Sequence, residues 1–209
     1  DEALQPAGEP VQDPADTLDR NVAIRFSHDY GDVQGAFANA AHVFDDVYEH
    51  GAVAPVCMET NGTVASFDPA SGILQVWTAT QAPYFIRKEL AHVLDLPTER
   101  VQIRPVEVGG GFGGKSKINE QEALCAMLSI KAGRPVKLTL DRHEEFVSGK
   151  TDHAKRIRVR TAVDAFGNIL GRSSSLVIDN GAYTALASTY VAAARQRNAC
   201  LYRVQAAHY

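Results

Sequence analysis

The stretch EVGGGFGGKSK, residues 107–117, places five glycines within six consecutive positions. Glycine loses more backbone freedom on folding than any other residue, so such a run usually marks a close approach to another group or unusual backbone dihedral angles. The run is interrupted only by Phe112, and an exposed aromatic ring has little structural purpose on a flexible loop. We therefore expect the loop to contact a ligand, and the alternative is a glycine-rich surface loop that binds nothing.

The same stretch also fits the G-x-x-x-x-G-K-[ST] pattern of a nucleotide-binding P-loop, with its fixed positions at Gly109, Gly114, Lys115 and Ser116. Two features of the surroundings argue against that interpretation. The preceding segment, VQIRPVEV at 101–108, has polar residues on one face and an internal proline, whereas the strand before a P-loop is buried on both faces. The best helix-capping signal lies at Asn119, about one turn too late.

Composition limits the classes of partner. The chain has 209 residues, 45% hydrophobic and 22% charged, which is typical of a soluble globular protein with one domain or two small ones. With 25 acidic and 21 basic residues, the net charge of -4 offers no general attraction to nucleic acid. No segment approaches the roughly 18 to 20 continuous apolar residues that span a bilayer, so neither nucleic acid nor a membrane is an expected partner.

Cysteine and histidine give no metal signature. Cys57, Cys125 and Cys200 lie far apart without a C-x-x-C pair, and the seven histidines show no H-x-x-x-H spacing. A zinc site therefore lacks a signature, and the cysteine usage fits a reducing, cytoplasmic compartment.

Patterning predicts an α+β fold in which helices pack on largely antiparallel or mixed sheets. Residues 1–21 are acidic and rich in proline, which is typical of an extended linker, and 22–209 form the folded part. The expected helices are a short one after Asp32, one over 82–96 and one from Asn119 to Gly133. The expected strands are 42–51, a hairpin over 63–79, 101–108, 135–141, and two strands joined at 164–168.

Three segments resemble the molybdopterin-binding large subunit of the xanthine dehydrogenase and aldehyde oxidase family, in its first molybdopterin-binding region. TATQAPYFIRKELAHVLDLPTERVQIRPVEVGGGFGGK (78–115) is similar to a stretch that runs from a T-Q-x-P turn to the glycine block. EALCAMLSIKAGRPVKLTLDRHEEF (122–146) and DNGAY (179–183) are similar to two later segments. The resemblance covers about residues 30 to 185. It implies that 22–209 are part of the α+β molybdopterin-binding domain.

The resemblance also implies that the organic cofactor holds the metal and that no side chain ligates it. It further implies roles for individual residues. Gln81 would donate a hydrogen bond toward an oxo ligand of molybdenum, and Phe112 would flank the substrate or the metal. The glycine backbone would approach the cofactor without intervening side chains, at Gly110, Gly111, Gly113 and Gly114. Simpler interpretations remain open: Gln81 could satisfy nearby backbone at a helix start, and Phe112 could anchor the loop to the core.

Other charged residues have local interpretations. Lys115 could pair with a carboxylate, and Arg142 with Glu144 could form a fold-stabilising pair or remain solvated. His50 and Glu59 lie in a segment only vaguely similar to the family's H-x-x-x-E-P region. Ser116 stands where several xanthine-oxidising relatives have an acidic residue, which puts purine specificity in doubt.

The reaction that the resemblance implies is hydroxylation of an aldehyde or an N-heteroaromatic substrate with oxygen taken from water. The family's general base is a glutamate in a G-x-G-E segment, and this sequence contains none. The catalytic residue therefore stays unassigned. We expect the chain to supply one wall of the cofactor site and to be inactive alone.

The expected cofactor is molybdopterin, and its mononucleotide and cytosine dinucleotide forms are both compatible with the sequence. The expected partners are the remaining C-terminal part of the large subunit, domains or subunits that carry iron-sulfur clusters and flavin, and a small-molecule substrate. Self-association through uncovered apolar surface is also expected. A non-catalytic remnant that binds a partner subunit is a further alternative.

Overall fold

The computed structural model describes residues 22–181, 187–197 and 202–209. The expected linker over 1–21, Ala182 and Tyr183 of the DNGAY segment, and Cys200 lie outside the described residues. The chain divides into two compact units. Unit 1 comprises Asp1–Ala52 and His153–Tyr209, and unit 2 comprises Val53–Asp152.

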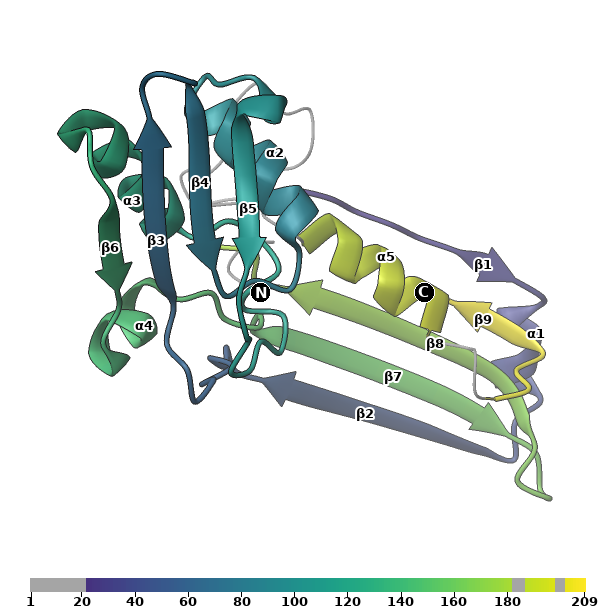
Figure 1. Cartoon of the computed structure of the whole chain (residues 1–209). Helices are drawn as coiled ribbons and strands as arrows, with labels where there is room; N and C mark the ends of the chain where they lie inside the picture. Colours follow the sequence, from purple (N-terminus) through teal and green to yellow (C-terminus); the bar gives the residue numbers. More distant parts are fainter. Residues whose placement is uncertain (1–21, 182–186, 198–201) are drawn as a thin grey trace. The chain divides into compact units, whose positions relative to one another are not determined.

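Unit 2 contains a four-stranded mixed sheet with the order β5-β4-β3-β6 (Figure 1). Its strands are β3 (Gly62–Asp68), β4 (Ile73–Thr78), β5 (Val101–Pro105) and β6 (Val136–Thr139). The predicted hairpin is present as the antiparallel pair β3 and β4, whose turn ends at Gly72 with φ of 67°. β5 follows the short 3-10 helix η2 (Thr98–Arg100), pairs in parallel with β4 and forms one edge of the sheet.

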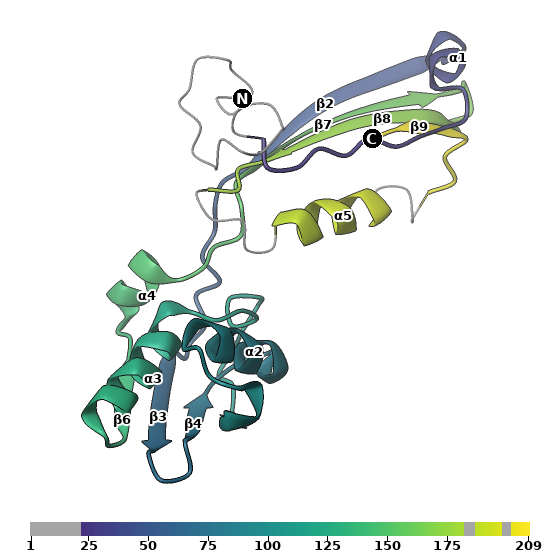
Figure 2. The same ribbon diagram turned by 90° about the horizontal axis from the view of Figure 1, so that it is seen from above.

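Two helices of unit 2 cover the same face of this sheet (Figures 1 and 2). α2 spans Pro83–Val93, shorter than the predicted 82–96, and α3 spans Glu120–Ala132. α3 begins as predicted, because the Glu122 carboxylate accepts the Asn119 N–H at 2.8 Å. The core lies between these helices and the sheet and consists of Ala65, Leu74, Val76, Ile86, Leu90, Ala91, Val101, Cys125 and Ala126.

The helix α4 (Arg142–Ser148) was not predicted. The predicted strand over 135–141 ends at Thr139, and the chain then turns into this helix. The reason is a capping box at its start. The Asp141 side chain accepts the Glu144 N–H, and the Glu144 side chain accepts the Asp141 N–H, both at 2.8 Å.

Unit 1 contains a five-stranded sheet with the order β1-β9-β8-β7-β2 (Figure 1). Three long antiparallel strands match the predicted ones, and two short strands, which were not predicted, extend the sheet through a parallel β8–β9 pair. The strands are β1 (Asp29–Tyr30), β2 (His42–His50), β7 (Lys155–Val163), β8 (Ile169–Ile178) and β9 (Ala206–His208). Together with unit 2, this confirms the predicted α+β fold.

The helices of unit 1 are α1 (Val33–Ala38) and α5 (Ala187–Arg197), and α5 lies to one side of the sheet (Figure 2). α1 is capped as predicted, because the Asp32 carboxylate accepts the Gly35 N–H at 2.9 Å. It packs against β8 so closely that a β-carbon at Gly171 would lie 2.7 Å from the Ala36 Cβ. Among the described residues, the only buried apolar side chains of this unit are alanines: Ala162, Ala206 and Ala207.

Candidate functional site

The glycine loop, defined here as Gly109–Lys115, connects β5 to α3 in unit 2 and has an unusual backbone. Phe112 adopts φ of 48°, and Gly110 and Gly113 adopt φ of 106° and 90°. A residue with a side chain rarely adopts positive φ, and such conformations cost about 1 to 3 kcal/mol and concentrate at functional sites. Val56, in a neighbouring segment, is also strained, with φ of 45°. The loop and its neighbour therefore both carry strain.

The side chain of Gln81 holds the C-terminal half of the glycine loop. Its Oε1 accepts the N–H of Gly113 at 3.1 Å and the N–H of Lys115 at 3.3 Å. Only the carbonyl oxygen of an amide can accept two N–H groups, so the amide orientation is determined. The Nε2 group is left without a hydrogen bond to any described residue. Gln81 thus satisfies nearby backbone, as its simpler interpretation expects, and still has a free donor.

Gly111 is required by that arrangement. A β-carbon at this position would lie 2.4 Å from Cδ and 2.5 Å from Oε1 of Gln81. Real β-carbons do not approach other atoms so closely, so any larger residue would displace the Gln81 side chain. The glycine allows the amide to lie against the loop backbone.

Three consecutive backbone N–H groups of the loop remain unpaired. The N–H of Gly114 donates to the Gly111 carbonyl at 2.8 Å, and that of Gly113 is held by Gln81. Within the part of the chain that the structure describes, no hydrogen bond is formed by the N–H groups of Gly110, Gly111 and Phe112. Successive unpaired N–H groups in a backbone with alternating φ form a concave site for an anion or an oxygen ligand. Of the five loop residues that the prediction names from Gly110 to Gly114, the last two therefore have N–H groups that are already bonded within the chain.

The ring of Phe112 is 80% exposed, so the alternative in which it anchors the loop to the core is wrong. Two further apolar side chains near the loop are uncovered as well. Met58 is 96% exposed and Val56 is 50% exposed. The unpaired N–H groups therefore lie beside uncovered apolar side chains, a combination typical of ligand sites.

Glu59 and Lys115 form an ion pair at the base of the loop. The Lys115 Nζ lies 2.6 Å from Glu59 Oε2, and the lysine side chain is 1% exposed. The same oxygen accepts the N–H of Gly109 at 2.8 Å. Burial alone would raise the pKa of the Glu59 carboxyl, but the hydrogen bonds from Lys115 and Gly109 outweigh it and lower that pKa. The predicted pairing of Lys115 is confirmed, whereas only the weak H-x-x-x-E-P likeness pointed to its partner.

This pair also argues against the P-loop interpretation. A P-loop lysine must reach outward to phosphate oxygens, but the Lys115 ammonium is directed to Glu59 and buried. Moreover, α3 begins only at Glu120, and β5 is an edge strand rather than an internal one. The geometry thus removes both the cation and the helix N-terminus that a nucleotide phosphate would need.

Arg142 and Glu144 stabilise the fold separately and do not pair with each other. Arg142 donates to the carbonyl oxygens of Cys57 and Met58, at 2.5 and 3.0 Å. Glu144 caps α4, as described above. A neighbouring residue, Glu145, accepts both the backbone N–H and the side-chain amide of Asn61 at 2.8 Å. Residues of α4 therefore anchor the segment that carries Glu59. His50, which the same family likeness included, lies exposed on β2.

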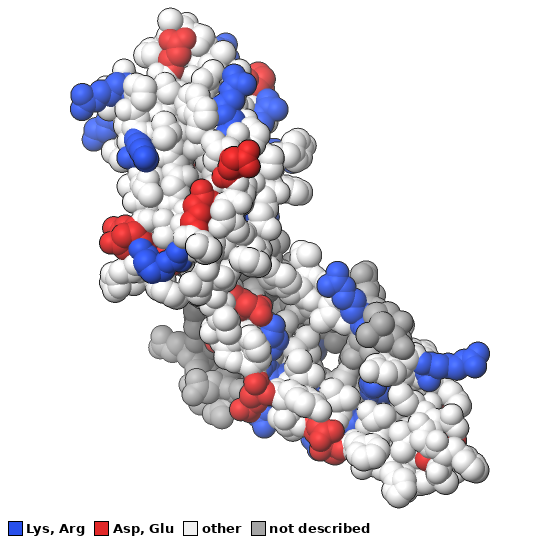
Figure 3. Space-filling view, turned by 60° about the horizontal axis from the view of Figure 1, so that its bottom comes forward, with Lys and Arg blue, Asp and Glu red and all other residues white. Residues whose placement is uncertain are grey.

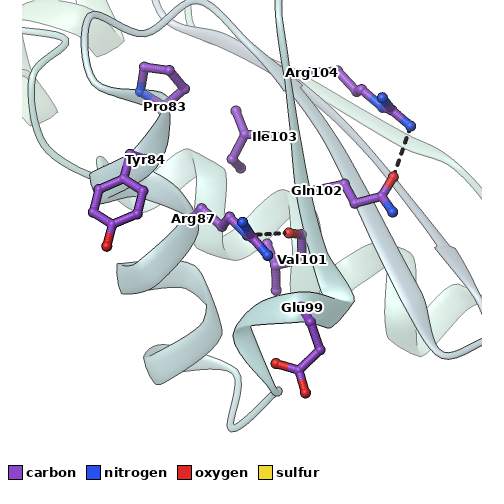
Figure 4. A pocket seen from close by; sticks show the side chains of 8 residues that line it. All are labelled: Pro83, Tyr84, Arg87, Glu99, Val101, Gln102, Ile103 and Arg104. Carbon is purple, nitrogen blue, oxygen red and sulfur yellow. Dashed lines mark hydrogen bonds between the residues drawn. The ribbon is translucent and has the colours of Figure 1, made fainter.

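A separate hollow of about 370 Å³ lies between α2 and the free edge of β5 (Figure 4). It is lined by Pro83, Tyr84, Arg87, Glu99, Val101, Gln102, Ile103 and Arg104, none of which belongs to the glycine loop. Arg87 Nε donates to the Val101 carbonyl at 2.9 Å and so occupies one acceptor of the edge. Farther along the same strand, Pro105 has no N–H that another strand could bind. The edge is thereby protected against pairing with another strand.

The described residues contain no group of three or more histidine, cysteine or acidic side chains able to hold a metal ion. None of the helices in this part of the chain is long and apolar enough to cross a membrane. On the face shown in Figure 3, acidic and basic side chains are interspersed rather than gathered into a field of one sign.

Comparisons with known proteins agree on one family. The family model for the molybdopterin cofactor-binding domain matches residues 15–209. The large subunit of nicotine 6-hydroxylase from Paenarthrobacter nicotinovorans is 34% identical over 163 residues, which are 78% of this chain and 20% of that subunit. A probable xanthine dehydrogenase subunit from Bacillus subtilis is 36% identical over 168 residues, 80% of this chain and 22% of that protein.

A solved structure gives the same result for the fold. Quinoline 2-oxidoreductase from Pseudomonas putida 86 superposes with a TM-score of 0.78 at 30% identity, over 88% of this chain and 24% of that one. This chain therefore spans about a fifth to a quarter of the length of these three relatives.

Proposed function

This chain belongs to the molybdopterin cofactor-binding domain family, and on that premise we propose that its glycine loop binds the oxygen-rich end of a molybdopterin cofactor. The observation that carries the proposal is the set of three adjacent unpaired N–H groups at Gly110, Gly111 and Phe112. Such donors bind oxo, phosphate and pterin oxygens well. They also suit a cofactor whose metal is not ligated by any protein side chain.

Three parts of the site would bind the cofactor and shield the substrate. The backbone N–H groups would bind cofactor oxygens, and the unpaired side-chain amide NH2 of Gln81 would donate one further hydrogen bond. The exposed ring of Phe112 would exclude water beside the substrate. Gly113 and Gly114 would maintain the conformation of the loop rather than donate to the cofactor, because their N–H groups are already bonded within the chain.

When bound, the cofactor would supply the redox chemistry that side chains lack. The residues of this chain provide binding and orientation. Among the described residues, the carboxylate beside the loop is that of Glu59, and it is a poor general base because it is held by Lys115 and has a lowered pKa. We infer that proton transfer belongs to a part of the large subunit that this chain does not include, and that this chain alone turns over no substrate.

The finer assignments extend the same proposal. The substrate would be an aldehyde or an N-heteroaromatic compound, with electrons passing to iron-sulfur and flavin groups on partner domains or subunits. Residues 22–209 would form part of the molybdopterin-binding domain, preceded by an extended linker over 1–21, and the protein would work in the cytoplasm. The exposed apolar side chains of β2, which include Phe44 and Tyr48, favour self-association when no partner is present.

Titration of the 209-residue chain with isolated molybdenum cofactor, in its mononucleotide and cytosine dinucleotide forms, tests the proposal. We expect saturable binding that protects the Gly110–Phe112 amides from hydrogen exchange, and no binding of ATP with Mg²⁺. Binding of ATP in place of the cofactor would overturn the proposal, as would cofactor binding that leaves these amides unprotected. A dye-linked oxidation assay on the same sample should give no turnover.

The matched variant is Gln81→Glu. A glutamate at this position keeps an oxygen that accepts the two loop N–H groups, but it lacks the NH2 group of the glutamine amide. We expect it to preserve the exchange pattern of the free loop and to weaken cofactor binding by about tenfold, the size of one lost hydrogen bond to a charged group. Unchanged affinity would remove Gln81 from the site.

A further inference from the structure

The segment Pro55–Glu59 lies directly against the glycine loop. A β-carbon at Gly114 would lie 2.8 Å from Pro55 Cγ, and one at Gly109 would lie 2.5 Å from Glu59 Cβ. Between these points, Gly110 faces Cys57, with 3.3 Å separating a β-carbon there from the Cys57 Cβ. Several loop glycines are therefore needed because this segment, and not only a ligand, approaches their backbone.

Glu59 connects the two ends of the loop. Its Oε2 accepts both the Gly109 N–H at 2.8 Å and the Lys115 Nζ at 2.6 Å. Its backbone N–H donates to the Gly109 carbonyl at 3.2 Å, and its carbonyl accepts from Lys115 Nζ at 3.2 Å. One residue thus makes four hydrogen bonds to the first and last positions of a loop in which the N–H groups of residues 110–112 make none to the described residues.

The segment that carries Glu59 is itself fixed from the other side. The guanidinium of Arg142 binds the carbonyls of Cys57 and Met58, and the carboxylate of Glu145 binds Asn61 twice. Glu59 therefore projects from a segment that is held at both of its flanks. A group anchored in this way can determine the distance between the ends of a loop.

We propose that Glu59 is a positioning residue of the cofactor loop: by joining Gly109 to Lys115 it keeps the backbone in the conformation that leaves the N–H groups of residues 110–112 unpaired. The inference rests on the proposed function. Glu59 touches neither the unpaired donors nor the ring of Phe112, so it acts through the loop backbone. It is 38% exposed, and its bond to the Gly109 N–H adds nothing to the hydrophobic core of unit 2.

The competing explanation is that the ion pair only stabilises the fold, because a buried lysine that loses its partner is costly. Two substitutions separate these explanations. Glu59→Gln removes the negative charge from the ion pair. The double variant Glu59→Gln with Lys115→Met removes both charges, so that no unpaired buried cation remains and folding is preserved. A matched control is Glu89→Gln, which neutralises the neighbouring pair between Glu89 and Lys117 at 3.3 Å, outside the loop.

The measurement is residue-resolved amide hydrogen exchange of the full chain without cofactor. We expect the amides of Gly113 and of position 115 to exchange about tenfold faster or more in the double variant, while those of α3 keep their wild-type rates. The Glu89→Gln variant should leave the loop unchanged. If loop and α3 amides accelerate together, or if the loop does not respond, the positioning role is refuted.

A second readout links the loop to its ligand. The double variant should bind isolated cofactor about tenfold more weakly than wild type, with the α3 exchange rates as evidence that the fold is intact. Equal affinity would refute the positioning role. If the wild-type chain itself binds no cofactor, the proposed function fails, and the exchange measurement still decides whether Glu59 orders the loop.

Discussion

The two units are stabilised in different ways. Unit 2 buries large aliphatic side chains from its sheet and from both of its covering helices, and these form one core cluster. Among the described residues, unit 1 buries only three alanines as apolar groups, and every residue of β2 is exposed. Side chains of β2 such as Phe44 and Val47 lie uncovered on opposite faces of that strand. Unit 2 therefore has its own core, whereas the described residues of unit 1 leave their large apolar side chains at least partly exposed.

The largest expected effect tests this contrast with one truncation in each unit. Leu90→Ala removes a fully buried side chain from α2 and should lower the free energy of unfolding of unit 2 by about 2 to 5 kcal/mol. Val47→Ala on β2, where the side chain is 49% exposed, should cost about 0.5 kcal/mol or less. Chemical denaturation followed by the fluorescence of Trp77 in β4 measures unit 2, and denaturant-dependent amide exchange of β7 measures unit 1. Equal losses would show that unit 1 has a core comparable to that of unit 2.

A smaller effect is expected within the loop. Gly111→Ala forces a β-carbon onto the Gln81 side chain, so the amide must leave the loop backbone. We expect a loss of about 1 to 3 kcal/mol in unfolding free energy, together with faster exchange of the Gly113 amide. Gly51→Ala is the control, because nothing lies within 4 Å of its added carbon. A fully stable Gly111→Ala variant with a protected Gly113 amide would contradict the described packing.

Acid should weaken unit 2 in part through Glu59. Because the folded-state pKa of this carboxyl is lowered, its contribution is complete above its ordinary pKa of 4.5 and is lost as the pH falls through the lowered value. Burial raises the pKa of Glu122, so that residue acts oppositely: its contribution is complete below 4.5 and is lost as the pH rises. The stability difference between wild type and Glu59→Gln should therefore be constant near neutrality and shrink below 4.5. A difference independent of pH would exclude the ion pair as its source.

The smallest effect is expected on the surface of unit 1. Asp45 on β2 pairs with Arg158 on β7 at 2.7 Å, and both side chains are solvated. Such pairs contribute little because water and salt screen them. Asp45→Asn should leave the thermal unfolding midpoint of the chain unchanged within error. A clear loss of stability would show that charge pairing compensates for the small core of unit 1.

Local patterns predicted most of the fold. The hairpin followed from alternating residues around the 68–72 turn, and α3 followed from Asn119 and Glu122, since these signals depend on neighbours in sequence. The helix α4 and the two short strands of unit 1 were missed. β1 and β9 pair residues about 180 positions apart and are too short for any periodicity to appear.

The site was predicted unevenly for the same reason. The glycine run and Gln81 were found from motifs, and the structure brings them together although about 30 residues separate them. The identity of the free donors could not be found, because it depends on which N–H groups the loop uses internally. For Glu59 the only signal in the sequence was the weak H-x-x-x-E-P likeness, with no sign of its role in the loop, because its partners follow 50 and 56 positions later.

The first and last residues of unit 2 are bonded to each other. The Asp152 N–H donates to the Val53 carbonyl at 2.8 Å, and the Val53 N–H donates back to the Asp152 carbonyl at 3.3 Å. A protein segment whose entry and exit points touch can be transplanted as a cassette, because a short linker closes the gap that it leaves behind. The gene region for residues 53–152 therefore offers a natural unit for swapping the glycine loop, with its supporting scaffold, between relatives.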